Sequence, residues 1–190
     1  MKTSRAGGKT QVDLLHFNNE NRQLFTVILA IDTFSRYITC AKVLEDRTPE
    51  EVIKALEIAF SSEGRPRTVV TDNGSQFYTN FDTHTHPFGV FLAFYKTNPL
   101  RISPRQPRKN GIVERAVQNC KREAIRPFKN EGSITIQQRL FRWRNWYNFR
   151  RKHAGIENKR PAELFKPYYK RIALGFLKDV ISEDFVGCTM

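Results

Sequence analysis

Three acidic residues lie in sequence surroundings that could bring their carboxylates together. Asp13 is inside the apolar segment QVDLLHF, Asp72 ends the segment VVTD, and Glu114 opens a basic amphipathic stretch. Converging carboxylates repel one another unless one is protonated or a cation neutralises them. Their oxygens are hard ligands that suit Mg²⁺ or Mn²⁺. Two such ions about 3.5–4 Å apart activate the attacking oxygen and stabilise the leaving oxygen in phosphoryl transfer.

Each of these acids, taken alone, also has a purely structural interpretation. Asp13 could be an edge-strand residue, and Asp72 could be a turn residue, because Asp-Asn-Gly is typical turn sequence. Glu114 could be a solvated glutamate that is favoured by the N-terminus of a helix. The case for chemistry therefore depends on whether the fold brings the three side chains together.

The segments around the first two acids predict strands. Residues 11–17, 25–31 and 37–43 are expected to form an antiparallel meander, and the apolar run 25–31 is typical of a strand covered on both faces. Residues 68–71 predict a fourth strand, which follows a helix and is expected to run parallel to an earlier strand. Asp72 ends this strand, and active groups gather at the carboxyl ends of strands in such sheets.

Helix signals punctuate the rest of the chain. Thr48 as N-cap, Pro49 at the first helical position and Glu51 closing a capping box predict a helix that ends near Gly64. Residues 78–87 predict an irregular insertion, 88–95 a helix, 100–103 a weak strand and 104–109 a basic loop. Further helices are expected at 111–126, with Pro127 as its stop, and at 134–150.

The helix that contains Glu114 can be divided into faces at about 100° per residue. One stripe is apolar and should pack on the sheet: Val113, Val117, Cys120 and Ala124. A second face holds Glu114, Gln118 and Lys121, flanked by Arg115 and Arg122. Glu114 is therefore expected in the first turn, beside the sheet edge, with basic side chains following it.

The charge of the chain points to a polyanionic partner. There are 32 Lys and Arg against 19 Asp and Glu, which gives a formal net charge of +13 and a pI near 10.0. Basic side chains release the counterions condensed on a phosphate backbone, so nucleic acid is the expected partner. A merely basic globular protein is the alternative. Hydrophobic residues make up 39% of the chain, enough for a core.

Compartment is inferred from the cysteines and the termini. Cys40, Cys120 and Cys188 are scattered, which favours a reducing, intracellular location, either cytoplasm or nucleoid if the source is bacterial. The polar first ten residues do not form a secretory signal, and no apolar run is long enough to span a bilayer, so no membrane partner is expected.

The order of elements and acids resembles the catalytic core of retroviral integrases and of the bacterial insertion-sequence transposases that share it. The matching segments are QVDLLHF, VVTDNGSQF and KNGIVERAVQNCKRE. A second match follows the core, to the transposase pattern N-x-x-R-P-H-x-x-L-x-x-x-x-P-x-E. It involves Asn148, Arg151, His153, Ile156, Pro161 and Glu163, with Lys152 in place of the usual proline.

The resemblance implies a ribonuclease H-like α/β fold, with a five-stranded mixed sheet flanked by helices. It implies a basic N-terminal extension at 1–10, a catalytic core at 11–165 and a tail at 166–190. Asp13, Asp72 and Glu114 would be the catalytic residues and the ligands of two Mg²⁺ or Mn²⁺ ions. The expected DNA contacts are Arg105, Arg108, Lys109, Asn110, Gly111, Arg115, Lys121 and Arg122.

Several other residues were weighed for function. His84 and His86 share a metal-like H-x-H spacing but are expected to be loop histidines, and Asp32 is expected to be a turn residue rather than an accessory carboxylate. His153 is expected to be structural. Trp143 and Tyr147 are expected to pack in the core, although stacking on bases is the alternative for the aromatic cluster 143–149.

The activity that this pattern favours is DNA strand nicking followed by transfer of a 3′-hydroxyl, by a polynucleotidyl transferase acting on element ends and target DNA. Because two DNA ends must be handled together, the resemblance also implies a homo-oligomer. Two alternatives remain open: a catalytically silent DNA-binding module of the same fold, and a structure-selective nuclease. The first is favoured by the lack of a zinc or helix-turn-helix pattern in residues 1–10.

Overall fold

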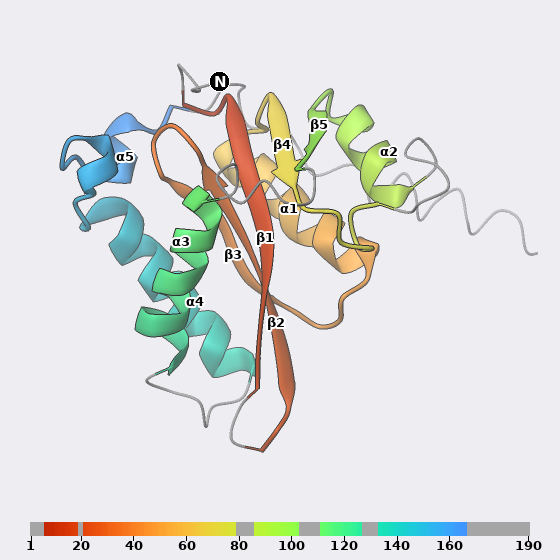
Figure 1. The fold of residues 1–190 in the computed structure, drawn as a ribbon, viewed down its shortest axis with the longest axis horizontal. Coiled ribbons are helices and arrows are strands. Elements are labelled where there is room, and N and C mark those ends of the chain that lie inside the picture. Colours follow the sequence, from red (N-terminus) through yellow and green to blue (C-terminus); the bar gives the residue numbers. More distant parts are fainter. Residues whose placement is uncertain (1–5, 19–20, 79–85, 103–110, 127–132, 167–190) are drawn as a thin grey trace, which may run out of the picture.

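A computed structural model gives the fold of residues 6–18, 21–78, 86–102, 111–126 and 133–166. Five strands form one mixed sheet in the order β3-β2-β1-β4-β5 (Figure 1). Their bounds are β1 (Lys9–Asn18), β2 (Leu24–Asp32), β3 (Ile38–Leu44), β4 (Thr68–Thr71) and β5 (Asn98–Arg101). β1, β2 and β3 pair antiparallel, whereas β4 pairs parallel with both β1 and β5. The predicted five-stranded mixed sheet is confirmed.

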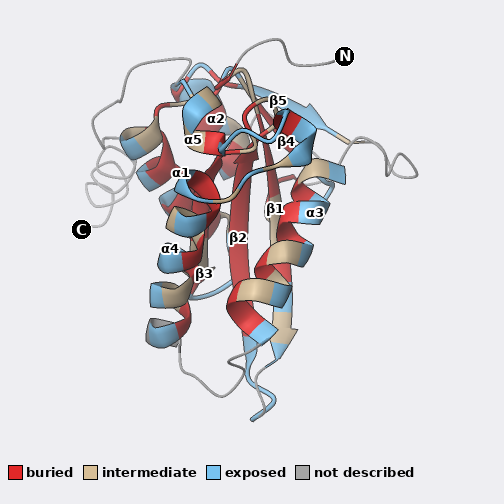
Figure 2. Cartoon of the chain, turned by 90° about the vertical axis from the view of Figure 1, so that its left-hand side faces the viewer, coloured by how far each residue is buried: buried red, intermediate tan, exposed pale blue. Residues whose placement is uncertain are grey.

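Helices cover both faces of this sheet (Figure 2). α1 (Pro49–Glu63) and α2 (Pro87–Phe94) pack on one face, and α3 (Gly111–Cys120) and α4 (Ser133–Phe149) pack on the other. The interior strand β2 divides its side chains between the two cores: Ile28 and Ala30 face α1, whereas Val27, Leu29 and Ile31 face α3 and α4. The continuous apolar run of this strand follows from that double burial.

The first strand begins earlier than predicted. β1 starts at Lys9, and Ala6 before it is buried. The backbone N–H of Gly7 donates a 2.8 Å hydrogen bond to the carboxylate of Asp32, which also accepts from Ser35 N and Oγ at 2.7 Å. The end of the expected N-terminal extension thus belongs to the sheet, and Asp32 is the turn residue that the sequence favours.

The start of α1 is capped differently from the prediction. The Thr48 hydroxyl accepts from Glu51 N at 3.4 Å, as expected of an N-cap. The reciprocal half of the capping box was wrong, because Thr48 N donates to Asp46 Oδ1 at 2.8 Å and Glu51 instead pairs with Lys54. At the other end, Gly64 has φ 86°, a conformation that glycine adopts without strain.

The helix that carries Glu114 changes its geometry after Cys120. Residues Lys121–Ile125 form a π-helical turn, closed by a hydrogen bond from Arg126 N to Lys121 O. The predicted helix over 111–126 is confirmed, and its last turn is π-helical rather than α-helical. The predicted apolar stripe is confirmed, since Val113, Val117, Cys120 and Ala124 are all buried.

α4 lies against the edge strand β3 and satisfies its free backbone groups. Near one end, Val43 N donates to the Gln137 side chain at 2.8 Å. Near the other, the Asn148 amide accepts from Ile38 N at 2.8 Å and donates to Ile38 O at 3.0 Å. Eleven residues of helix and five of strand both span about 17 Å, so the two contacts can form together. This pairing covers an edge that would otherwise be exposed.

After α4, a short 3₁₀ turn (Ala154–Ile156) and α5 (Pro161–Leu164) complete the described fold. The predicted stripe of α4 is buried as expected: Ile136, Leu140, Trp143 and Tyr147. None of the helices in the described residues is long and apolar enough to cross a membrane.

Candidate active site

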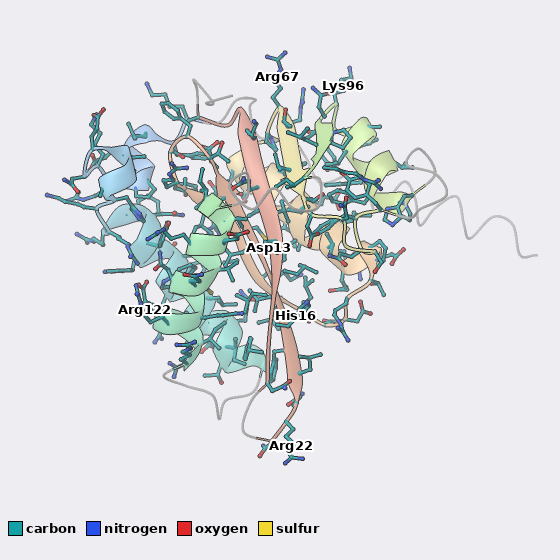
Figure 3. The ribbon with its side chains drawn as sticks, in the orientation of Figure 1. Asp13, His16, Arg22, Arg67, Lys96 and Arg122 are labelled. Carbon is teal, nitrogen blue, oxygen red and sulfur yellow. The ribbon has the colours of Figure 1, made fainter. Side chains whose placement is uncertain are left out.

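Asp13 lies on the face of β1 that looks toward α3. Side chains alternate along a strand, and Leu15, two residues on, packs in the core formed with α3 and α4, whereas Val12 packs with α1. Asp13 is half-buried, and its Oδ1 accepts a 2.8 Å hydrogen bond from Leu14 N. Figure 3 shows its side chain beside β1, on the side of α3.

Asp72 reaches the same level through the register of β1 and β4. The ladder pairs Lys9 with Thr68 and Gln11 with Val70, and the same offset continued by two residues brings Asp13 level with Asp72. Neighbouring strands lie about 4.8 Å apart. Asp72 is exposed at the carboxyl end of β4, where its Oδ1 accepts from Gly74 N at 3.0 Å.

Glu114 is held near Asp13 by a hydrogen bond that the sequence analysis missed. Gln11, two residues before Asp13 and on the same face of β1, is buried, and its Oε1 accepts from Val113 N at 3.2 Å. This bond fixes the first turn of α3 against β1 at the residue before Glu114. The sequence did hold a signal for this bond. Gln11 occupies a strand position that is normally buried, and a buried side-chain amide needs a hydrogen-bond partner.

The pKa of Asp13 reports the proximity of the other two acids. Burial raises it most, the charge of Asp72 raises it further, and the charge of Glu114 adds to this, whereas the Leu14 hydrogen bond and the Lys121 ammonium oppose the shift. The result is a pKa of about 6. The fold therefore brings the three acids into electrostatic contact, each from a different element.

The arrangement is not a closed metal cage. Within the described ranges, no three His, Cys, Asp or Glu side chains are grouped closely enough to hold an ion as they stand. The acids can shift the pKa of Asp13 without being close enough to share an ion, because electrostatic coupling extends over longer distances than direct coordination. The acids therefore form an open cluster, in which the charges act on one another without the side chains being drawn together.

The predicted DNA contacts divide between described and undescribed residues. Gly111 and Arg115 are exposed in the first turn of α3, and Lys121 is near enough to lower the pKa of Asp13. Arg122 is exposed, and its guanidinium donates to Asn119 Oδ1 at 3.1 Å and to Glu123 at 2.8 Å (Figure 3). The others lie outside the described residues: Arg105, Arg108, Lys109 and Asn110.

The residues that resemble the transposase pattern, Asn148 to Glu163, include two with structural roles, Arg151 and His153. Arg151 contacts Glu123 in the π-helical turn. The Arg151 guanidinium donates to both Glu123 oxygens at 2.7 Å, and Trp143 Nε1 donates to the same carboxylate at 3.0 Å. The His153 ring lies 4.5 Å from that of Tyr147, and burial together with Arg151 and Arg36 lowers the His153 pKa to about 4. His153 is therefore a neutral packing residue, as expected.

His86, Trp143 and Tyr147 also have structural roles. His86 caps α2, accepting from Phe88 N at 3.2 Å through Nδ1, with Nε2 bonded to Ser75 O. His84 lies outside the described residues. Of the aromatic cluster, Trp143 and Tyr147 are in the core, as predicted, whereas Trp146 and Phe149 are exposed.

Comparisons with known proteins agree with the geometry. The family described as "Integrase core domain" matches residues 3–110, and a second family of the same description matches residues 95–161. The Gag-Pro-Pol polyprotein of Sheep pulmonary adenomatosis virus is 30% identical over 119 residues, which is 63% of this chain and 6% of the polyprotein. The putative transposase InsD for insertion element IS2E of Escherichia coli (strain K12) is 24% identical over 161 residues, 81% of this chain and 71% of that protein.

Solved structures with the same fold include integrase catalytic cores. The HTLV-2 integrase catalytic core domain in complex with magnesium superposes with a TM-score of 0.66 and 19% identity, covering 86% of this chain and 99% of that one. A chain of the simian T-cell lymphotropic virus intasome gives a TM-score of 0.71 and 21% identity, over 91% of this chain and 58% of that one.

The fold is thus the ribonuclease H-like fold of these cores. The chain spans about a tenth or less of the polyprotein relatives and of the Caenorhabditis elegans protein K02A2.6. The match of the first family covers more than half of the chain, and it includes both Asp13 and Asp72. The chain belongs to the integrase core domain family.

Proposed function

We propose that this chain is the catalytic domain of a DNA integrase or transposase, a polynucleotidyl transferase that nicks DNA and joins a 3′-hydroxyl to target DNA. Asp13, Asp72 and Glu114 hold two Mg²⁺ or Mn²⁺ ions. The observation that carries the proposal is geometric. The β1–β4 register brings Asp13 level with Asp72. The Gln11–Val113 hydrogen bond holds the first turn of α3, which contains Glu114, against β1. Three acids from three elements are costly to bring together unless a cation offsets their charges.

The relatives support the same chemistry. The InsD relative of insertion element IS2A/D/F/H/I/K from Escherichia coli is a transposase, and the HTLV-2 core was solved in complex with magnesium. The donor set fits such ions, because carboxylate oxygens are their preferred ligands and the open cluster leaves room between them. When bound, the ions would activate the attacking oxygen and stabilise the leaving oxygen.

The protein's own residues have distinct tasks in this proposal. Asp13 must lose its proton to bind a cation, and Lys121 assists by lowering its pKa. Gln11 fixes the first turn of α3 and so the approach of Glu114 to the sheet. Exposed basic groups on α3, above all Arg115, contact the DNA backbone and orient the scissile phosphate.

The test is an oligonucleotide cleavage and strand-transfer assay with Mg²⁺ or Mn²⁺. Glu114→Gln should abolish both reactions while keeping the fold and DNA binding, since it removes one anionic ligand and leaves the buried stripe of α3 intact. Glu50→Gln is a matched control, because Glu50 is also an exposed glutamate in the first turn of a helix. Full activity of Glu114→Gln would contradict the assignment.

The same assay separates the alternatives. Cleavage without joining would indicate a structure-selective nuclease, and DNA binding without any turnover would indicate a silent binding module. The partners of this proposal are element ends, target DNA and further copies of the chain. The HTLV-2 core was solved in dimeric and trimeric forms, and we expect an oligomer here. Light scattering with and without DNA measures it.

A further inference from the structure

A basic pocket lies beside the acid cluster, where three segments distant in sequence meet. The start of α3, the turn between β2 and β3, and the segment that follows α4 enclose a cavity of about 540 Å³. Ligand pockets in proteins commonly measure roughly 300–1,000 Å³. Arg115, which lines this cavity, directly follows Glu114 in the chain. The pocket thus shares Arg115 with the proposed active site, but none of the three acids lines it.

The lining of the pocket is strongly cationic. Five basic residues contribute to it, and no Asp or Glu does: Arg36, Arg115, Arg122, Arg151 and Lys152. Two of the five share one carboxylate just outside, which offsets a single positive charge, because Glu123 accepts from both Arg122 and Arg151. In the described part of the chain, Arg36, Arg115 and Lys152 form no ion pair, so the pocket keeps an excess of positive charge.

Arg36 occupies a built position rather than a loose surface one. The turn that carries it is fixed by the buried Asp32 carboxylate and Ser35, and Arg36 itself has φ 64°. Its Nη1 donates to Thr33 O at 2.5 Å, and burial lowers its pKa. A Cβ atom at Gly155 would lie 3.9 Å from Arg36 Nε and Nη2, so the guanidinium rests against the far wall of the pocket. A partly desolvated cation of this kind is stabilised when an anion binds it.

The histidine in the lining is consistent with a positive potential. The charges of Arg151 and Arg36 act with burial to hold His153 neutral. Protonated histidine would add a sixth cation to the lining, and the present charges oppose it. The pocket is thus complementary to an anion and not to another cation.

We propose that this pocket binds a phosphate of the DNA backbone, with Arg36, Arg115 and Lys152 as its donors. Guanidinium groups match phosphate oxygens with paired N–H donors, and Lys152 adds a point charge. Arg115 follows Glu114 in α3, so the bound phosphate belongs to DNA that contacts this helix. The choice of DNA as the ligand rests on the proposed function, whereas the anion site itself follows from the lining.

The test is the affinity of the protein for a short DNA duplex, measured by fluorescence anisotropy without divalent ions at several salt concentrations. Lys152→Gln and Arg36→Gln should each weaken binding several-fold and reduce the slope of log K against log salt by about 1, because each removes one phosphate contact. Arg36→Lys should recover part of the loss, since it keeps the charge but not the paired donors.

Arg22→Gln is the matched control. It makes the same change of charge at an exposed position beyond the opposite end of β2 (Figure 3), and the nine residues of that strand span about 30 Å. Thermal unfolding of each variant separates lost binding from lost fold, and Lys152 is exposed, so its variant tests the pocket even if Arg36→Gln unfolds. Wild-type affinity and slope for Lys152→Gln and for a folded Arg36→Gln would overturn the proposal.

Two further outcomes have defined meanings. Tighter binding of RNA than of DNA with the same sequence would overturn the assignment to DNA. Suppose that the pocket variants lose binding while the wild type never cuts DNA. This outcome would support the pocket and contradict the proposed catalysis. The two conclusions are separable because the binding assay contains no divalent ion and does not depend on cleavage. Saturating inorganic phosphate should compete with DNA in the wild type and compete less in Lys152→Gln.

Discussion

At the residue scale, the pKa of the half-buried Asp13 carboxylate depends on the charges and hydrogen bonds around it. Its backbone hydrogen bond with Leu14 and the nearby Lys121 favour the charged form, yet burial and the two other acids prevail and raise its pKa to about 6. An aspartate with a purely structural role at a sheet edge would gain nothing from surroundings that disfavour its charged form. The residue is therefore a local source of instability, which is common where a site is organised for a ligand.

This cost predicts a pH-dependent gain of stability in Asp13→Asn. The folded pKa is about 6 against a reference of 3.8, so wild-type stability should fall as pH rises from about 4 to 6, where the native state holds the extra proton. Asparagine keeps the acceptor for Leu14 N and carries no charge. Without divalent ions at pH 7.5, we expect the variant to be more stable by about 1–3 kcal/mol.

Denaturant unfolding of both proteins at pH 4 and pH 7.5 measures the difference. The gain should shrink toward pH 4, where the wild-type carboxylate is mostly protonated in the folded state. A variant less stable than the wild type at pH 7.5 would show that Asp13 carries no electrostatic strain. Glu50→Gln, far less buried and at a helix start, is the comparison in which no gain is expected.

At the element scale, α4 acts as a clamp on the edge strand β3. Its apolar stripe packs on the sheet, and two polar side chains eleven residues apart, Gln137 and Asn148, reach the backbone of β3. Asn148 is also the first residue of the block that resembles the transposase pattern. Its fixed place in that pattern has a physical reason, because it replaces a missing neighbouring strand at Ile38.

The clamp predicts a large effect for Asn148→Leu. The change leaves Ile38 N without its acceptor and removes one donor to Ile38 O, in a fully buried setting. An unsatisfied buried polar group costs about 1–3 kcal/mol, so we expect a loss of about 2–4 kcal/mol in the free energy of unfolding. Asn145→Leu on the same helix is the control, and urea unfolding compares the two. Equal effects would argue against the clamp.

At the scale of the whole molecule, the sheet collects acids from β1, from the end of β4 and from α3 at one level, and cations from the β2–β3 turn and the segment after α4 beside them. The chain has a net charge of +13, and its acidic and basic groups are separated in the fold rather than mixed. A small negative centre lies next to a cationic pocket, which is the pairing that a metal-dependent enzyme acting on a polyanion requires.

This arrangement predicts that divalent ions stabilise the fold. An ion that binds only the native acid cluster adds RT ln(1 + [L]/Kd), about 1.4 kcal/mol at ten times Kd. Mg²⁺ at pH 7.5 should raise the melting temperature of the wild type and of Glu50→Gln, and should raise that of Asp13→Asn and Glu114→Gln less. An equal rise in all four proteins would mean that the ion binds elsewhere. The effect should weaken below pH 6, where protons compete for Asp13.

The sequence by itself determined those features that depend on near neighbours. The strand at 68–71, the N-cap at Thr48 and the buried stripe of α3 follow from local periodicity and capping preferences, and the structure confirms each. The acids and their order were also readable, because the surrounding motifs are short and contiguous. Even the mistaken half of the capping box was a local error, since Asp46 competes for the same N–H as Glu51.

Only the tertiary structure decided how distant segments meet. The register that brings Asp13 level with Asp72, the bond from Val113 N to Gln11 and the meeting of Arg36 with Gly155 join residues far apart in the chain. Periodicity within one segment carries no information on its alignment with another. That alignment is set by side-chain packing and by the need to satisfy buried hydrogen-bonding groups, which are properties of the assembled molecule.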